Sequence, residues 1–83
     1  MISEKEAKSI ATAVFIEKYT REYLLTVVDR IAMWWSKSKG IFDMNFGIFP
    51  ETKSEDGETF AKFLMEVEVD MKTGKANVVD QAD

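Results

Sequence analysis

The residues best suited to chemistry in this 83-residue chain are three carboxylates spaced two apart, Glu66, Glu68 and Asp70. In an extended strand, residues at this spacing share one face, with neighbouring side chains about 7 Å apart. Such a row could hold a hard cation or exchange protons. A flat strand chelates poorly, however, because Ca²⁺ requires roughly six to eight convergent oxygens. We therefore interpret the row as the solvated face of a sheet and predict no metal site.

Two residue types that dominate protein chemistry are missing, since the chain contains neither cysteine nor histidine. Disulfides, metal sites built on imidazole or thiolate, and Ser-His or Cys-His catalytic pairs therefore cannot form. Residues 54–58 (SEDGE) lack the ligand spacing of a calcium loop, and residues 36–41 (SKSKGI) lack the pattern of a phosphate loop. We expect no enzyme activity and no cofactor.

Composition and charge restrict the class of protein further. With 46% apolar and 31% charged residues, the chain is typical of one folded domain over residues 1–83. Its net charge of −4 argues against nucleic acid as a partner, because phosphate binding needs clustered Lys and Arg. No apolar run approaches the ~20 residues of a membrane span, so membrane insertion is not expected. The N-terminus lacks a secretion signal, which favours a cytoplasmic location, although a mature chain whose leader had been cut would read the same.

The elements that position these residues begin with a helix. Ser3 and Glu6 have the spacing of a capping box, in which each side chain bonds the backbone N–H of the other residue. The apolar residues that follow recur at helical spacing and form a single stripe. The pattern predicts a helix over residues 3–19 that lies on an apolar surface through Ala7, Ile10, Ala11, Val14 and Phe15.

Alternation of apolar and polar residues predicts the strands that supply this surface. Residues 61–72 and 41–49 alternate, and residues 75–80 return after a tight turn in which Gly74 requires positive φ. The residues expected to face the core are Phe42, Met44, Phe46 and Ile48 in one strand and Ala61, Phe63, Met65, Val67, Val69 and Met71 in another.

Residues 22–36 fit two patterns. Leu24, Val27, Val28, Ile31 and Trp35 would form one face of a helix, whereas Leu25, Val27, Ile31, Met33 and Trp35 would form one face of a strand. The β-branched and aromatic content favours the strand, joined by residues 36–40 to the next strand in a hairpin. We therefore predict an α+β fold with one N-terminal helix packed on a four-stranded antiparallel sheet. The alternative is an ααβββ fold in which residues 22–36 are helical.

The adjacent tryptophans would face opposite ways on such a strand. Trp35 aligns with the predicted core residues. Trp34 aligns with the outer face of the sheet, where contiguous apolar surface is typical of a contact with a partner or a second copy. The candidate interface on this face consists of Trp34, Leu24, Val28, Arg30 and Leu64.

Both ends of the chain resemble a known family. Residues 2–11 (ISEKEAKSIA) are similar to the opening helix of PepSY-like, cystatin-like small domains, and residues 65–80 (MEVEVDMKTGKANVVD) are similar to their closing hairpin. The matching positions cover about a third of the chain, and Met65 stands where an aromatic residue is usual. The resemblance implies a small α+β domain with an inhibitory or protein-binding role, and it supplies no catalytic residues.

These observations predict a non-catalytic small protein-binding or inhibitory module, self-associating through the open sheet face, with a protein partner or a second copy of the chain as its ligand. One alternative is a small acidic inhibitor or nucleic-acid mimic of the phage type, which would use residues 51–58 and the carboxylate row. Another is a domain that binds an apolar small ligand between helix and sheet, in a pocket lined by Phe15, Phe46, Phe63 and Trp35.

Overall fold

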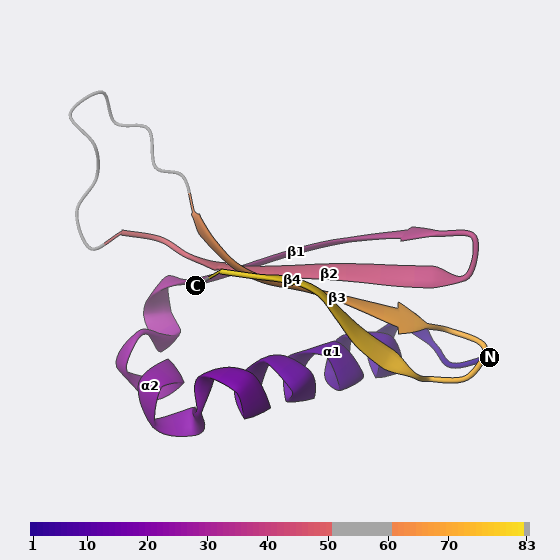
Figure 1. Ribbon diagram of the computed structural model, residues 1–83, viewed down its shortest axis with the longest axis horizontal. Helices are drawn as coiled ribbons and strands as arrows, with labels where there is room; N and C mark the ends of the chain where they lie inside the picture. The colour runs from indigo at the N-terminus through magenta and orange to yellow at the C-terminus, as the bar shows by residue number, and fades with distance from the viewer. Residues whose placement is uncertain (51–60, 83) are drawn as a thin grey trace.

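The structure is a computed structural model that describes residues 1–50 and 61–82. The strands form one antiparallel sheet in the order β1-β2-β3-β4, and α1 lies across one of its faces (Figure 1). This confirms the predicted α+β arrangement. The acidic loop considered at residues 51–58 lies outside the described residues. The elements in chain order are α1 (Glu4–Tyr19), α2 (Arg21–Thr26), the 3₁₀ turn η1 (Val28–Arg30), β1 (Ile31–Ser38), β2 (Ile41–Ile48), β3 (Lys62–Asp70) and β4 (Ala76–Gln81).

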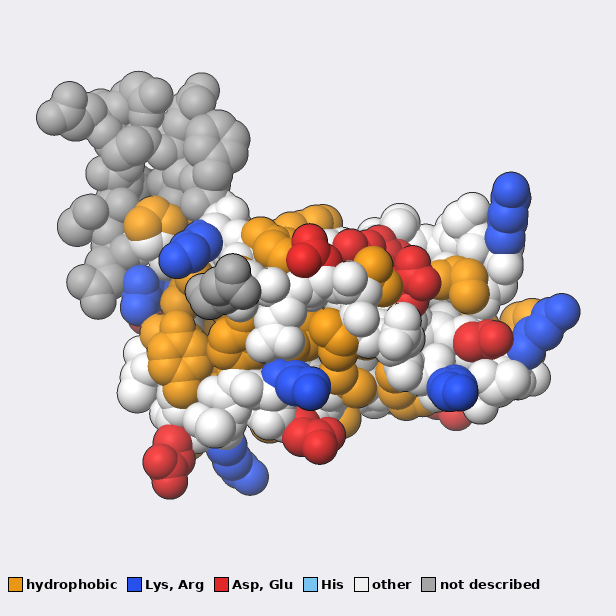
Figure 2. Space-filling view, in the orientation of Figure 1, with side chains coloured by type: hydrophobic (Ala, Val, Ile, Leu, Met, Phe, Trp, Pro, Cys, Tyr) orange, Lys and Arg blue, Asp and Glu red, His pale blue; other side chains and the backbone are white. Residues whose placement is uncertain are grey.

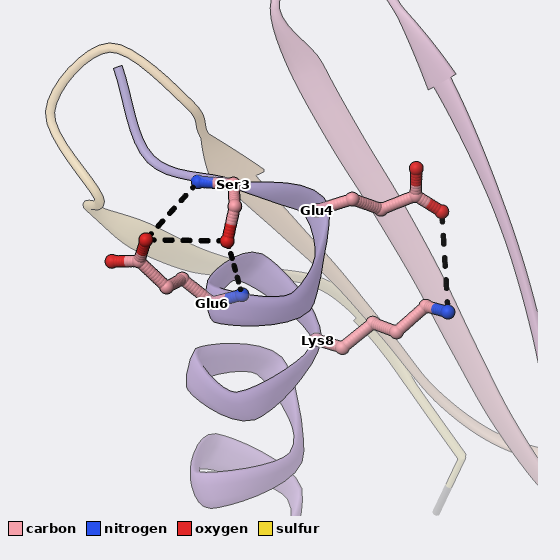
Figure 3. A network of polar contacts seen from close by, with 4 residues as sticks. All are labelled: Ser3, Glu4, Glu6 and Lys8. Atoms are coloured by element: carbon pink, nitrogen blue, oxygen red, sulfur yellow. Dashed lines mark hydrogen bonds and ion pairs between the residues drawn. The ribbon is translucent and has the colours of Figure 1, made fainter.

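Helix α1 begins at the predicted capping box (Figure 3). Ser3 Oγ accepts a hydrogen bond from the Glu6 N–H at 3.1 Å, and Glu6 Oε1 accepts one from the Ser3 N–H at 3.4 Å. One turn further on, Lys8 Nζ lies 3.9 Å from Glu4 Oε1. The helix ends at Tyr19 because Thr20 adopts a φ of 59°, which leaves the helical region.

The core lies between α1 and the inner face of the sheet. Helix α1 buries Ala7, Ala11 and Phe15, and the two alanines allow the helix to approach the strands closely. The Phe15 ring stacks on Phe46 with 4.2 Å between ring centroids. Helix α1 packs chiefly over β2, β3 and β4, so β1 lies outside the cover of the helix. The buried residues of the strands include the predicted Phe42, Met44, Phe46, Met65, Val67 and Val69.

Residues 22–36 form neither one strand nor one helix. The predicted strand is right only from Ile31 onward, and the helical alternative is right only within α2. Thr20 Oγ1 accepts a hydrogen bond from the Tyr23 N–H at 3.3 Å, which starts the short helix. The charged pair Asp29 and Arg30 lies in the η1 turn, where neither side chain has to face the core.

Strand β3 contains a β-bulge, and the predicted alternation is wrong from this point towards the N-terminal end of the strand. The pairing passes from Phe46 opposite Met65 to Gly47 opposite Phe63, which leaves Leu64 as an extra residue. The extra residue reverses the alternation, so Leu64 and Met65 are both buried while Phe63 moves to the face opposite α1. The Leu64 carbonyl accepts hydrogen bonds from the Tyr19 hydroxyl at 3.0 Å and from the Ala82 N–H at 2.8 Å.

The two hairpin turns agree with the sequence patterns. Lys39 and Gly40, with φ values of 53° and 78°, form a two-residue turn of the mirror-image kind that matches strand twist. Gly74 has a φ of 76°, as the turn between β3 and β4 requires. Both turns fix the register of the strands that they join.

We predict that Ser3→Ala lowers the free energy of unfolding by about 0.5–2 kcal/mol, because the Glu6 N–H loses the hydroxyl that accepts its hydrogen bond. Urea denaturation monitored by circular dichroism measures the change. The matched control is Ser9→Ala at an exposed position inside α1, where alanine is the better helix former. An equal loss in both variants would contradict the capping role.

Candidate functional site

The face of the sheet opposite α1 carries the carboxylate row. The register places Asp43 opposite Glu68, Glu66 opposite Asp80, and Ile41 opposite Asp70. Because paired residues point to the same face, the predicted row is joined there by acids from β2 and β4. Figure 2 shows carboxylates gathered along the sheet on this side of the molecule. The open face is therefore acidic along much of its length.

Three of these acids form a tight cluster. One carboxylate oxygen from each of Asp43, Glu66 and Glu68 lies within 4.8 Å of the others. Asp43 Oδ1 is buried and has no hydrogen-bond partner among the described residues. The hydrogen bond that protonated Glu66 donates to Asp43, together with desolvation and the neighbouring carboxylates, raises the pKa of Glu66 to about 7. The cluster can hold a proton near neutral pH. The three carboxylate oxygens that lie together are fewer than the roughly six to eight that Ca²⁺ takes.

We predict that this cluster makes stability depend on pH. The folded-state pKa of Glu66, about 7, lies above its ordinary value of 4.5, so the folded state binds this proton more tightly than the unfolded state. The stability that protonated Glu66 contributes is complete below about pH 4.5 and is lost as the pH rises through about 7. Glu66→Gln removes the titration, and it should flatten the Tm profile across this window and raise Tm above pH 7.

Differential scanning calorimetry from pH 4 to 8 measures this effect. Glu17→Gln is the matched control, because Glu17 is an exposed acid on α1 and lies outside the cluster. A Glu66→Gln profile that runs parallel to the wild-type profile at every pH would contradict the shared proton.

Trp34 lies on the open face, as predicted, and its ring covers Gly47. A Cβ built at Gly47 would lie 3.1 Å from two carbons of the Trp34 ring and 2.8 Å from the Lys62 carbonyl oxygen. Gly47 is buried, whereas Trp34 remains 42% exposed. The glycine therefore provides the space in which the indole lies flat across the sheet towards β2.

We predict that Gly47→Ala destabilises the fold by about 1–3 kcal/mol, because the added methyl group meets a backbone oxygen that cannot move alone. Displacement of the indole should also change the tryptophan emission. Ser36→Ala, on the same face of β1, is the control that changes one small side chain without crowding. Unchanged stability and emission in Gly47→Ala would overturn this account of Trp34.

Trp35 faces α1, so the two tryptophans point to opposite faces as predicted. The prediction that Trp35 is a core residue is wrong, because its side chain is 44% exposed. The reason is that β1 is the outermost strand and α1 covers its neighbours instead. The Lys8 ammonium group lies 3.8 Å from the Trp35 ring centroid and partly covers this face of the indole.

The five residues of the candidate interface do not gather on the open face. Leu24 and Leu64 are buried in the core, Leu64 because of the bulge and Leu24 because α2 turns it inward. Val28 is 62% exposed, but it lies in η1 on the helix side. Arg30 donates from Nη1 to the Phe49 carbonyl at 3.2 Å. Of the four apolar members, only Trp34 lies on the predicted surface.

The exposed apolar surface lies instead in a groove of about 540 Å³ between the helices and β1, which we call the β1 groove. Six of the ten large hydrophobic side chains exposed in the described part of the chain lie in this groove or on β1. Phe15 and Phe46 line the groove as predicted for an apolar pocket, but Phe63 and Trp35 do not. The full lining is Thr12, Phe15, Ile16, Arg21, Leu24, Leu25, Val28, Ile31, Met33 and Phe46.

The sequence held part of the signal for this groove. Ile16 lies outside the predicted helix stripe, and Leu25, which the strand interpretation placed on the core-facing side, belongs to α2. The two side chains are 41% and 64% exposed. The α1–α2 corner at Thr20 brings them to the same groove as Met33. The groove therefore depends on the change of chain direction between α1 and α2. The prediction of one strand over residues 22–36 does not include that change.

Comparisons with protein-family models, with curated proteins and with solved structures gave no match to this chain. The resemblance of its two ends to PepSY-like, cystatin-like domains therefore stays a prediction. Within the described residues, no helix combines the length and the apolar character needed to cross a membrane.

Proposed function

We propose that this chain is a non-catalytic protein-binding or inhibitory module whose contact surface is β1 together with the β1 groove. The observation that carries the proposal is the position of the groove, which runs beside an edge strand with no neighbour on its outer side among the described residues. Concentrated exposed apolar surface of this kind is typical of a protein contact.

The outer edge of β1 presents backbone groups for pairing. In a hairpin with a two-residue turn, the flanking residues Ser38 and Ile41 form a hydrogen-bonded pair, and hydrogen-bonded and non-hydrogen-bonded pairs then alternate. Ser38, Ser36, Trp34 and Ala32 therefore direct their N–H and C=O groups towards β2. The intervening residues, Ile31, Met33, Trp35 and Lys37, direct theirs outward.

The two edges of the sheet differ in how well they are protected against pairing. Strand β4 has six residues, a register shift against β3 and an acidic side chain, Asp80. Strand β1 has eight residues and pairs with β2 without a shift, and its one charged residue, Lys37, lies next to the turn end. Short, bulged and charged edges resist the addition of a strand, so β1 is the edge that favours it.

An extended segment that pairs with β1 would bind in two ways. Its backbone would bond the outward groups at Met33 and Trp35, which gives affinity without regard to sequence. Every second side chain would point to the helix side and enter the β1 groove. There it would contact the exposed apolar side chains of Leu25, Val28 and Ile16. The groove thus supplies selectivity for a strand with alternating apolar residues.

A small apolar ligand is the second candidate for this site. A groove of about 540 Å³ has the volume of a drug-sized site. Its lining, however, includes side chains that are 41–64% exposed, whereas ligand sites enclose most of their ligand. A protein segment, which also satisfies the strand edge, accounts for both features of the surface.

Selection from a displayed library of peptides about ten residues long tests the proposal. We expect the enriched peptides to alternate apolar and polar residues, and we expect Met33→Lys and Leu25→Lys to weaken their binding about tenfold or more. Val79→Lys is the matched control, because Val79 is an exposed apolar residue on the opposite edge strand. Bound peptide should also slow hydrogen exchange at the Met33 and Trp35 amides.

Three outcomes would count against the proposal. If the wild-type chain enriches no peptide more strongly than the Met33→Lys variant does, the β1 surface is not the contact surface. Binding that Val79→Lys abolishes and Met33→Lys preserves would move the contact to β4. If basic peptides bind in a salt-sensitive way and neither variant weakens their binding, the contact surface is the acidic open face. That result would favour the acidic-inhibitor alternative.

A further inference from the structure

We infer that the segment accepted by β1 is β1 of a second copy of this chain, paired antiparallel in the register that places Trp34 opposite Trp34 on a two-fold axis. The inference rests on the proposed function, since it uses the same edge and groove. It names the occupant and the residue-by-residue pairing, and it joins two four-stranded sheets into one continuous sheet.

Symmetry restricts the registers that are available. A two-fold axis perpendicular to the sheet keeps both α1 helices on the same side, so helix-side residues of one copy must face helix-side residues of the other. A slip of one residue would place the helix-side residues opposite open-face residues, and it is therefore excluded. Because the outward backbone groups belong to Ile31, Met33, Trp35 and Lys37, the hydrogen-bonded pairs must come from this set.

The register centred on Trp34 is the best of those that remain. It pairs residues 31–37 of the two copies, with Met33 opposite Trp35 twice and Ile31 opposite Lys37 twice. A shift of two residues in one direction shortens the pairing to residues 31–35. A shift in the other direction places Met33 opposite Lys37. Only the register centred on Trp34 both pairs seven residues and places the two exposed apolar side chains of the helix side, Met33 and Trp35, opposite each other.

Trp34 is already arranged for a position on the axis. Its ring lies over Gly47 of its own sheet, towards β2 and away from the outer edge. Two such residues can therefore face each other across the axis without their rings competing for the same space. The opposed Cα atoms would form a non-hydrogen-bonded pair, about 4.5 Å apart.

The apolar area available meets the lower limit for a specific dimer. The exposed fractions of Ile16, Leu25, Val28, Met33 and Trp35 add up to about two and a half whole side chains, or roughly 500 Å² at about 200 Å² each. Two copies offer roughly 1,000 Å² of apolar surface, which is the size at which a biological interface begins. Pairing of β1 with β4 of another copy is a head-to-tail contact that leaves free edges at both ends, so the symmetric pairing is the one that closes.

Site-directed cross-linking tests the register, because the native chain has no cysteine. Trp34→Cys should form a disulfide-linked dimer under mild oxidation, since opposed Cα atoms about 4.5 Å apart fall within disulfide range. Ser36→Cys is the control on the same face. Its copies would lie four residues apart along the strands, roughly 13 Å, which is too far for a disulfide.

A second combination protects the test against misfolding of Trp34→Cys. In the proposed register, Ser36 of one copy faces Ala32 of the other, so a mixture of Ser36→Cys and Ala32→Cys chains should cross-link only between unlike chains, with both tryptophans retained. Cross-linking of either variant alone to the same extent as the mixture would overturn the register.

Analytical ultracentrifugation of the wild-type chain separates failure of the dimer from failure of the proposed function. We expect the mass to rise from 9.5 kDa towards twice that value with concentration, and Met33→Lys to shift this rise to at least tenfold higher concentration while Val79→Lys does not. A single 9.5 kDa species up to about 1 mM overturns the dimer, even where β1 still enriches peptides. Self-association that is unaffected by Met33→Lys also overturns it.

Discussion

The stack of Phe15 on Phe46 determines where α1 lies on the sheet. The two rings are nearly parallel, with their centroids 4.2 Å apart, and the small side chains of Ala7 and Ala11 continue the same contact along the helix. Phe46 belongs to β2, and the helix packs over β2, β3 and β4, so β1 projects beyond it. The exposure of Trp35, the β1 groove and the unshielded strand edge all follow from this offset. A helix centred on the sheet would have closed the groove and buried the tryptophan.

The two faces of the sheet consequently present different surfaces. The helix side ends in an apolar groove at β1, whereas the open face carries Asp43, Glu66, Glu68 and Asp80 from three neighbouring strands. The hydrogen bond to Asp43, desolvation and the repulsion between like charges together raise the pKa of Glu66. An acidic open face opposes the stacking of one sheet on another through that face.

Much of the fold could be predicted from the sequence, because the capping box, the helix stripe and the two glycine turns are local signals. The capping box at Ser3 and the positive φ of Gly74 are confirmed. Two features depend on contacts that local patterns do not contain. The bulge at Leu64 arises where Gly47 and Phe63 pair across strands, and it turns a predicted surface residue into a core residue. The predicted burial of Trp35 depended on which strands α1 covers, and alternation assigns a residue to a face without saying whether that face is covered. In the candidate interface, Leu64 was misplaced by the bulge, whereas Leu24 and Val28 were misplaced because they belong to α2 and η1 and not to a strand.

The two tryptophans of β1 point to opposite faces, as alternation predicted, but Trp35 is not in the core and neither ring is fully exposed. Trp34 covers the backbone at Gly47, where no side chain fills the open face, and Trp35 supports the Lys8 ammonium group on the helix side. The Trp34 ring lies over β2 and away from the outer edge, whereas Trp35 stays half-exposed on the helix side of β1. A strand added at this edge would therefore meet the Trp35 indole on its helix side. Apolar surface at that position would exclude water from the new backbone hydrogen bonds, and hydrogen bonds protected in this way gain strength. Pairing at the edge of β1 is thus favoured from the helix side, where the β1 groove also lies.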